Sequence, residues 1–355
     1  MDTCVHCRRR RKRKSSYGSC IQHHRGMIKQ DTEQLSLEKG RRPGQPGHEI
    51  ALKFLERRMG EIGLAPYEGD SYALPYGEFT NLAGVIEGTD SSALPVLIGA
   101  HYDSAIDGPS SDDNAVSVAL ILHTAELLIK KSPSRSTVIA FFDAEEKPNF
   151  LTKNMGSLRF YKDHCEDMEF ACVIILDMIG HNFEVGVPPV DLLVPGIKDF
   201  MFVLGSESHT QLPDIVERAS KDTKRLRIIP TLNRYIGDRS DHHAFRKAGQ
   251  PYLFLSRGWG KYSHTPKDNI QWINFSGVHR IENFLLRLLE QLDTAPMETR
   301  LEPADPFRYE IRMMRKAIGW PLPFILACLG FFRMALHSRE DINSLMRKVL
   351  KLAKF

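Results

Sequence analysis

Three short and almost wholly apolar segments of the chain end in histidine or acidic residues. They are 94–103 (LPVLIGAHYD), 136–146 (STVIAFFDAEE) and 172–181 (CVIILDMIGH), and further apolar segments cover 79–88, 190–196 and 251–258. Near-continuous apolar strands of this kind predict a mostly parallel sheet with helices on both faces. In such sheets functional groups gather beyond the carboxyl ends of the strands, where the polar residues of these segments lie.

Amphipathic helices are predicted between the strands. Apolar residues recur at helical spacing over 48–62, 113–131 and 275–292, and Gly63 follows the first helix as its expected C-cap. The alternation predicts an α/β fold with three layers, α/β/α, around a mixed, mostly parallel central sheet.

The composition is that of a globular protein. Of the 355 residues, 42% are hydrophobic and 26% are charged, which excludes a wholly disordered or collagen-like chain. We expect a basic, disordered arm over 1–45, one folded domain over 46–295 and a distinct extension over 296–355.

The formal net charge of +4 depends on the run RRRRKRK at 8–14. Without these seven cations, 41 basic residues face 44 acidic ones, so the body is mildly acidic. The arm could bind phosphates without specificity. No specific nucleic acid is expected as a partner, because the sequence predicts neither an aromatic stacking platform nor a nucleic-acid fold.

Cys4, Cys7, Cys20 and His23 have a spacing that could hold a structural zinc ion. The alternative, favoured by the cationic sequence between the pairs, is that they are incidental residues of a tail. The cysteines do not form a disulfide framework, and no apolar segment follows the basic run as in a signal peptide. We therefore expect a cytoplasmic protein.

The C-terminal extension combines an apolar segment, 318–332, with a basic amphipathic helix over 338–355. One interpretation is a helix pair that packs on the domain or in a homodimer. The other is peripheral attachment to a membrane surface, because the apolar segment is too short to span a bilayer but suits its interface.

Seven residues form the candidate site. They are His101, Asp103, Asp113, Glu145, Glu146, Asp177 and His264. Each alone has an ordinary explanation such as a solvated acid or a helix cap. Together they place buried carboxylates and two histidines at one sheet edge, which requires a neutralising cation. Histidine nitrogen and carboxylate oxygen suit a catalytic zinc, and two zinc ions that share one carboxylate would use two histidines and three acids.

The motifs NLAGVIEG, GAHYDS, SSDDNAVS, AEE, MGS, LDMIGH, SDHHAF and YSHTPKD occur in this order between residues 81 and 268. As a set they resemble the dizinc aminopeptidases and glutamate carboxypeptidases, a family of metallopeptidases whose relatives include the glutaminyl cyclases. The resemblance covers about residues 45–293 and implies the zinc-exopeptidase fold.

The resemblance also implies roles for individual residues. Asp113 bridges two Zn²⁺ ions, His101 and Asp177 complete the first zinc site, and Glu146 and His264 complete the second. Glu145 is implied as the general base, and Asp103 as the residue that orients His101. Asp241 and His242 match a segment near the substrate pocket.

An aminopeptidase that acts on peptide substrates is the function expected from these residues. A carboxypeptidase or dipeptidase is an alternative, in which Arg257 or Arg239 would hold the free carboxylate. A glutaminyl cyclase is disfavoured, because the cyclases use one zinc and the first-zinc residues His101 and Asp177 are both present. A catalytically inactive, peptidase-like binding domain is a further alternative, against which the complete ligand set argues.

Overall fold

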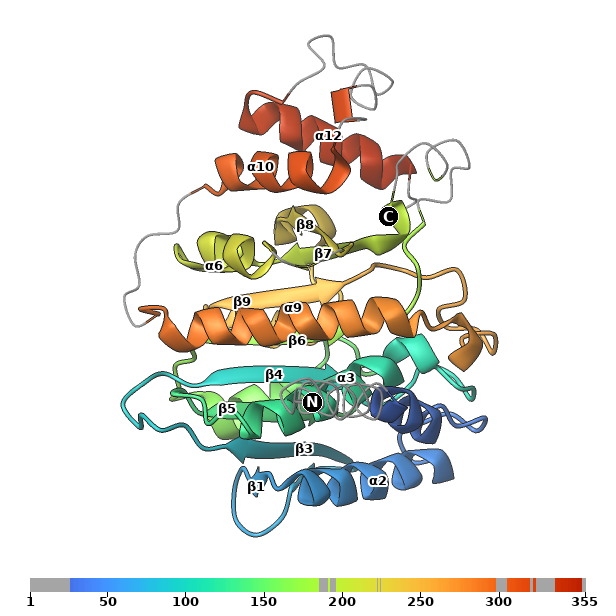
Figure 1. Ribbon diagram of the computed structural model, residues 1–355. Coiled ribbons are helices and arrows are strands. Elements are labelled where there is room, and N and C mark those ends of the chain that lie inside the picture. The colour runs from blue at the N-terminus through green and yellow to red at the C-terminus, as the bar shows by residue number, and fades with distance from the viewer. Residues whose placement is uncertain are drawn as a thin grey trace, which may run out of the picture.

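The computed structural model describes residues 26–184, 191, 196–221, 223, 225–297, 305–319, 322–323 and 336–352. In these residues nine strands form one sheet in the order β1-β3-β5-β4-β6-β9-β7-β8, with β2 paired to β3 (Figure 1). The strands are β1 (Ala65–Pro66), β2 (Ala73–Tyr76), β3 (Phe79–Ile86), β4 (Val96–His101), β5 (Thr137–Phe142), β6 (Cys172–Asp177), β7 (Phe200–Leu204), β8 (Arg227–Thr231) and β9 (Tyr252–Ser256).

The sheet is mixed, as expected. Its centre is parallel, since β4 pairs with both β5 and β6, and β6 pairs with β9 in the same direction. Antiparallel pairs lie toward both edges, between β3 and β5 and between β7 and β9. Because the chain passes from one side of β4 to the other, the carboxyl ends of β5, β4 and β6 surround a topological switch point, where α/β sheets bind ligands.

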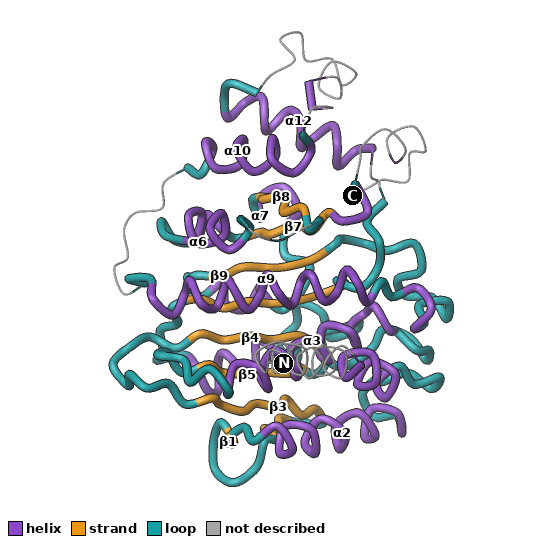
Figure 2. Tube along the Cα trace, in the orientation of Figure 1, coloured by secondary structure: helices purple, strands orange, loops and turns teal. Residues whose placement is uncertain are grey.

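Alternate strand residues face opposite layers. Ile98, Ile139 and Ile174 belong to a core beneath the helices α2 (Pro46–Ile62), α3 (Val116–Ile129), α6 (Leu212–Ala219) and α9 (Phe275–Thr294). On the other face Phe142 packs with Phe160 of α4 (Gly156–Phe160) and Phe245 of α8 (His242–Lys247). Figure 2 shows α3 and α9 across the sheet. The predicted three-layer architecture is therefore confirmed.

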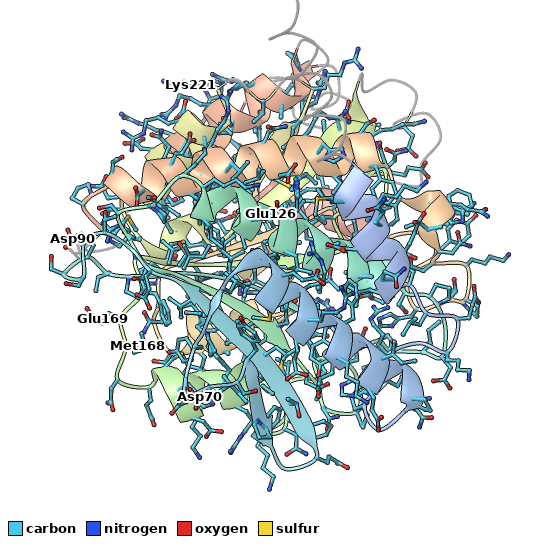
Figure 3. All side chains as sticks on the ribbon, turned by 60° about the horizontal axis from the view of Figure 1, so that its bottom comes forward. Asp70, Asp90, Glu126, Met168, Glu169 and Lys221 are labelled. Carbon is cyan, nitrogen blue, oxygen red and sulfur yellow. The ribbon has the colours of Figure 1, made fainter. Side chains whose placement is uncertain are left out.

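Figure 3 turns the β3 edge of the molecule toward the viewer and adds the side chains. The labelled Asp70 and Asp90 are exposed and lie in loops, after β1 and after β3. Ala51, Leu55 and Met59 of α2, in contrast, are fully buried against the sheet.

The three predicted helices are confirmed as α2, α3 and α9, and Gly63 caps α2 in the left-handed conformation. The strand expected at 190–196 lies largely outside the described residues. Sequence analysis missed β1, β2, β7 and β8. These strands are short or lie toward the edges, and three of them, β1, β2 and β8, contain proline.

The expectation of a disordered arm is wrong for residues 26–45. Residues 26–35 are helical, and Ile28 and Leu35 are fully buried. Asp31 forms a buried ion pair with Arg58 of α2 at 3.0 Å. The basic composition of the whole arm hid two apolar residues seven positions apart, which lie on one face of a helix. The four possible zinc ligands of the arm lie outside the described residues.

The C-terminal extension contributes α10 (Phe307–Ile318) and α12 (Arg339–Leu352), which lie beyond β8 in Figure 1. Apolar residues of α12 are buried against α10, namely Ile342, Leu345 and Met346 against Ile311 and Met314. The described part of the extension is therefore a helix pair packed on the domain. None of the helices described has the length and apolar character needed to cross a bilayer. Contact with a membrane or a second copy stays a prediction, and much of 318–335 lies outside the described residues.

We predict that Leu35→Ala destabilises the protein by about 2–5 kcal/mol, because it removes a fully buried side chain from the core. Denaturant unfolding measures this free energy. Gln34→Ala is the control, since its exposed neighbouring side chain leaves no cavity. Equal stability of the two variants would show that residues 26–35 do not pack on the domain.

Candidate metal centre

The candidate ligands lie on four segments that meet at the carboxyl edge of the sheet. His101 and Asp177 are the last residues of β4 and β6. Glu145 and Glu146 follow β5, and Asp113 lies in the turn η1 (Ser111–Ala115) that leads into α3. His264 comes from the loop after β9. Asp113 and His264, which are 151 positions apart in the sequence, are thereby brought within 3.0 Å of each other.

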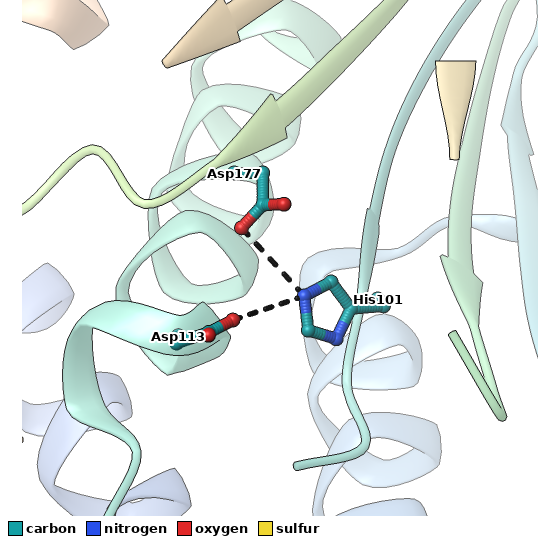
Figure 4. Close-up of side chains that lie close together, drawn as sticks. All are labelled: His101, Asp113 and Asp177. Atoms are coloured by element: carbon teal, nitrogen blue, oxygen red, sulfur yellow. Dashed lines mark ion pairs between the residues drawn. The ribbon is translucent and has the colours of Figure 1, made fainter. Parts of the chain in front are cut away.

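Two groups of side chains share Asp113. In the first, His101 Nε2 lies 3.3 Å from Asp113 Oδ1 and 3.6 Å from Asp177 Oδ1 (Figure 4). In the second, His264 Nε2 lies 3.0 Å from Asp113 Oδ2 and 3.1 Å from Glu146 Oε1. Asp113 therefore presents one oxygen to each histidine. Each group offers three ligand atoms within 4.8 Å of one another.

Burial dominates the electrostatics here. It raises the pKa of Glu146 to about 7, and the charge of Asp113 adds to the rise. Burial would also raise the pKa of Asp113, but the nearby imidazoles of His101 and His264 outweigh it and lower that pKa. Hydrogen bonds with Asp113 and Glu146 raise the pKa of His264 to about 10. The site therefore favours bound positive charge.

Two buried ligand atoms, His101 Nε2 and Asp177 Oδ1, have no hydrogen-bond partner among the described residues. Buried polar atoms are rarely left in this state in folded proteins. A cation held between these atoms and Asp113 would satisfy both. The donor set of imidazole nitrogen and carboxylate oxygen is one that fits zinc.

Glu145 lies beside both groups, and its carboxylate comes within 4.8 Å of ligand atoms of His101 and Glu146. Burial raises the pKa of Glu145 well above its ordinary value, while the charge of His101 opposes the rise. In the described part of the chain no ion pair holds this carboxylate, which distinguishes it from Glu146.

Asp103 holds three parts of the site together. Its Oδ1 lies 3.3 Å from His101 Nδ1 and accepts the backbone N–H of Glu145 at 3.1 Å, while Oδ2 accepts that of Glu146 at 3.1 Å. The orienting role predicted for Asp103 therefore has matching geometry. Its contact with the backbone of the acid pair was not predicted.

Sequence analysis missed Asp268, although it ends the quoted motif YSHTPKD. Its carboxylate accepts the backbone N–H groups of Asp112 at 2.9 Å and of Asp113 at 3.1 Å. Asp268 lies four residues after His264 in the same loop. It therefore connects the loop that carries His264 to the segment that carries Asp113. Asp112 in turn contacts His181 Nδ1 at 2.6 Å and does not face the metal groups.

The two residues predicted near the substrate pocket differ. Asp241 is fully buried, and neither of its carboxylate oxygens has a hydrogen-bond partner in the part of the chain that the structure describes. Its charge acts on Glu145. His242 is not brought to the ligands. Its Nε2 lies 3.1 Å from Asn233 Oδ1, and its ring stacks on Phe254 at 4.4 Å. Because successive residues of a helix start point in different directions, the shared motif did not place both at the site.

Trp259 borders the site. Its ring meets the ring of His264 edge-on at 4.7 Å, and 56% of its side chain is exposed. A molecule that approaches His264 from solvent would meet this indole.

A family model, described as peptidase family M28, matches residues 81–289. The chain belongs to peptidase family M28. Among curated proteins, the chain is similar to the uncharacterized protein YfbL of Escherichia coli, with 26% identity over 221 residues that cover 55% of this chain and 66% of YfbL. A vacuolar membrane protease of Schizosaccharomyces pombe is 31% identical over 94 residues, 26% of this chain and 11% of that protein. The chain thus covers less than two thirds of either relative.

Solved structures share the M28 fold at low identity. A Zn-dependent exopeptidase of Parabacteroides distasonis has a TM-score of 0.59 and 19% identity, over 75% of this chain and 97% of that one. A leucine aminopeptidase precursor of Bacteroides thetaiotaomicron has a TM-score of 0.59 and 17% identity, over 75% of this chain and 96% of that one. A glutaminyl cyclase of Porphyromonas gingivalis has a TM-score of 0.59 and 18% identity, over 75% of this chain and 97% of that one. At these identities the likeness establishes the fold alone.

We predict that Asp268→Asn lowers the affinity of the protein for Zn²⁺ by about 10–100-fold, the usual effect of losing a residue that orients a ligand. The amide turns a donor toward one of the two backbone N–H groups and displaces Asp113. Competition with a chromophoric chelator measures the affinity. Asp90→Asn, at an exposed loop residue, is the matched control and should bind as the wild type does.

Proposed function

We propose that this M28 domain is a zinc-dependent exopeptidase that holds two Zn²⁺ ions and removes N-terminal residues from peptides. The observation that carries the proposal is the position of Asp113, whose two oxygens lie 3.3 Å and 3.0 Å from two histidines of separate groups. A carboxylate that presents one oxygen to each of two such groups is suited to bind two neighbouring metal ions.

His101, Asp113 and Asp177 would hold one ion, and Asp113, Glu146 and His264 the other. These five residues supply three carboxylates and two imidazoles and no thiolate, which supports a catalytic rather than a structural zinc site. When bound, two zinc ions supply an activated water and polarise the carbonyl of the scissile peptide bond.

Glu145 is the proposed general base. Its carboxylate lies beside the ligands without an ion pair of its own among the described residues, so it is free to take a proton from the attacking water at one oxygen. It then gives this proton to the leaving amine. Asp103 fixes the backbone of Glu145 and thereby the position of the carboxylate.

The contacts of two arginines support cleavage at the N-terminus rather than at the C-terminus. Arg257 is fully buried and donates to the carbonyl oxygens of His181 and Lys198 at 2.9 Å and 2.7 Å. Arg239 is exposed and donates to the carbonyl of Ile236. Neither makes a described contact with the candidate ligands. With neither arginine placed at the ligands to hold a free carboxylate, we propose that a peptide binds by its free α-amine instead.

We also propose that the protein works in a reducing compartment, the cytoplasm. The buried residues Cys165 and Cys172 are free thiols, which is consistent with that setting.

We predict that Glu145→Gln keeps the bound zinc but lowers turnover by about 10²–10⁴-fold, because the amide cannot take a proton. Zinc content by elemental analysis and initial rates on a short unblocked peptide measure the two effects. Glu78→Gln, at an exposed residue, is the control. Near-normal turnover of the Glu145 variant would show that the base is a different group.

The substrate class is tested by mass spectrometry of a mixture of unblocked and N-acetylated peptides after incubation with the zinc-loaded protein. We expect products that lack N-terminal residues only from unblocked peptides, and none after treatment with a chelator. Products shortened at the C-terminus would indicate a carboxypeptidase, and cyclised N-terminal glutamine would indicate a cyclase. Intact peptides together with bound zinc would leave a binding domain without peptidase activity.

A further inference from the structure

Arg41 is among the largest fully buried side chains of the protein, and none of its partners is a carboxylate. Its Nε donates to the carbonyl of Tyr102 at 2.8 Å. Nη1 donates to Leu35 at 2.6 Å and Pro109 at 2.9 Å, and Nη2 to Ser110 at 3.0 Å and Asp113 at 3.3 Å. A guanidinium has five N–H groups, so every donor of this side chain is used by a backbone carbonyl.

Four of the five acceptors occupy the two ends of one loop. Tyr102 lies between His101 and Asp103, and the carbonyls of Pro109, Ser110 and Asp113 come from the other end. This loop joins the end of β4 to the start of α3 and therefore separates His101 from Asp113, two of the ligands of the first metal group. A planar fork that donates to both ends fixes the distance between them.

The backbone around Arg41 strengthens the same contact. The N–H of Arg41 donates to Ser104 Oγ at 2.7 Å, and Ser111 Oγ donates to Ser36 Oγ at 2.7 Å. Gly40 has φ of 68°, and a Cβ there would lie 2.3 Å from the carbonyl oxygen of Ile106. Only glycine permits this close approach of the two backbones.

Arg41 holds Asp113 by its backbone carbonyl and leaves the carboxylate free. Both oxygens of Asp113 thus remain directed to His101 and His264. An arginine paired with the carboxylate itself would occupy the oxygens that the metal groups share. Arg41 therefore holds the backbone of Asp113 in place without competing for the carboxylate oxygens.

We propose that Arg41 is a positioning residue of the metal centre, which sets the spacing of His101 and Asp113 through the loop between them. The inference rests on the proposed metal centre. It assigns this task to a segment that precedes residues 81–289, the part matched by the family model. Residues 35–41 are accordingly a built-in part of the site and not a linker.

The test compares Arg41→Lys with Arg58→Lys in the full chain. Both arginines are buried and tie residues 26–41 to the domain, but Arg58 pairs with Asp31 and contacts no candidate ligand. The affinity for Zn²⁺ is measured by competition with a chelator, and the stability of the metal-free proteins by thermal unfolding. We expect both variants to lose stability and only Arg41→Lys to lose affinity, by about 10–100-fold.

Wild-type affinity in Arg41→Lys, or an equal loss of affinity in Arg58→Lys, would overturn the positioning role. If Arg41→Lys does not fold, Ser104→Ala gives the answer, because it removes the acceptor of the Arg41 N–H and leaves the guanidinium in place, at the loss of one further hydrogen bond to the carbonyl of Ile106. A loss of affinity of about threefold to tenfold is then expected, and wild-type affinity would overturn the proposal. A wild-type protein that binds no Zn²⁺ would overturn the proposed function itself, which is a distinct result.

Discussion

The burial of several carboxylates at one edge of the sheet is the constraint on which the rest of the structure depends. Asp113, Glu146, Asp177 and Glu145 are all at most 7% exposed. An ionised acid in such a place is costly unless positive charge lies beside it. His101 and His264 supply part of that charge, and the proposed zinc ions would supply the remainder.

The supporting residues act mainly on the backbone rather than on the ligand side chains. Asp103 accepts the N–H groups of the acid pair, Asp268 accepts those of Asp112 and Asp113, and Arg41 donates to the carbonyls of the loop that precedes Asp113. The ligand oxygens and nitrogens therefore remain available to a metal. Preorganisation of this kind fixes ligand geometry before the metal binds.

Most of the fold was predictable because its signals are local. Buried strands that end in acids, such as 172–177, and the amphipathic stripe of α9 have characteristic periods in the sequence. The helix at residues 26–35 was not predicted, because its basic surroundings outweighed two apolar positions. The strands β7 and β8 were missed because they lie toward one edge of the sheet, where their apolar patterns are short.

The sequence by itself determined the residue types at the site, since strand ends and motif order identify His101, Asp113, Glu146, Asp177 and His264 as neighbours of one sheet edge. Only the tertiary structure decided which oxygen of Asp113 faces which histidine, that His242 turns away toward Phe254, and that Arg41 supports the loop. The physical reason is that periodicity records burial and residue chemistry within one segment. Distances between segments depend on strand order and helix packing, which no single segment contains.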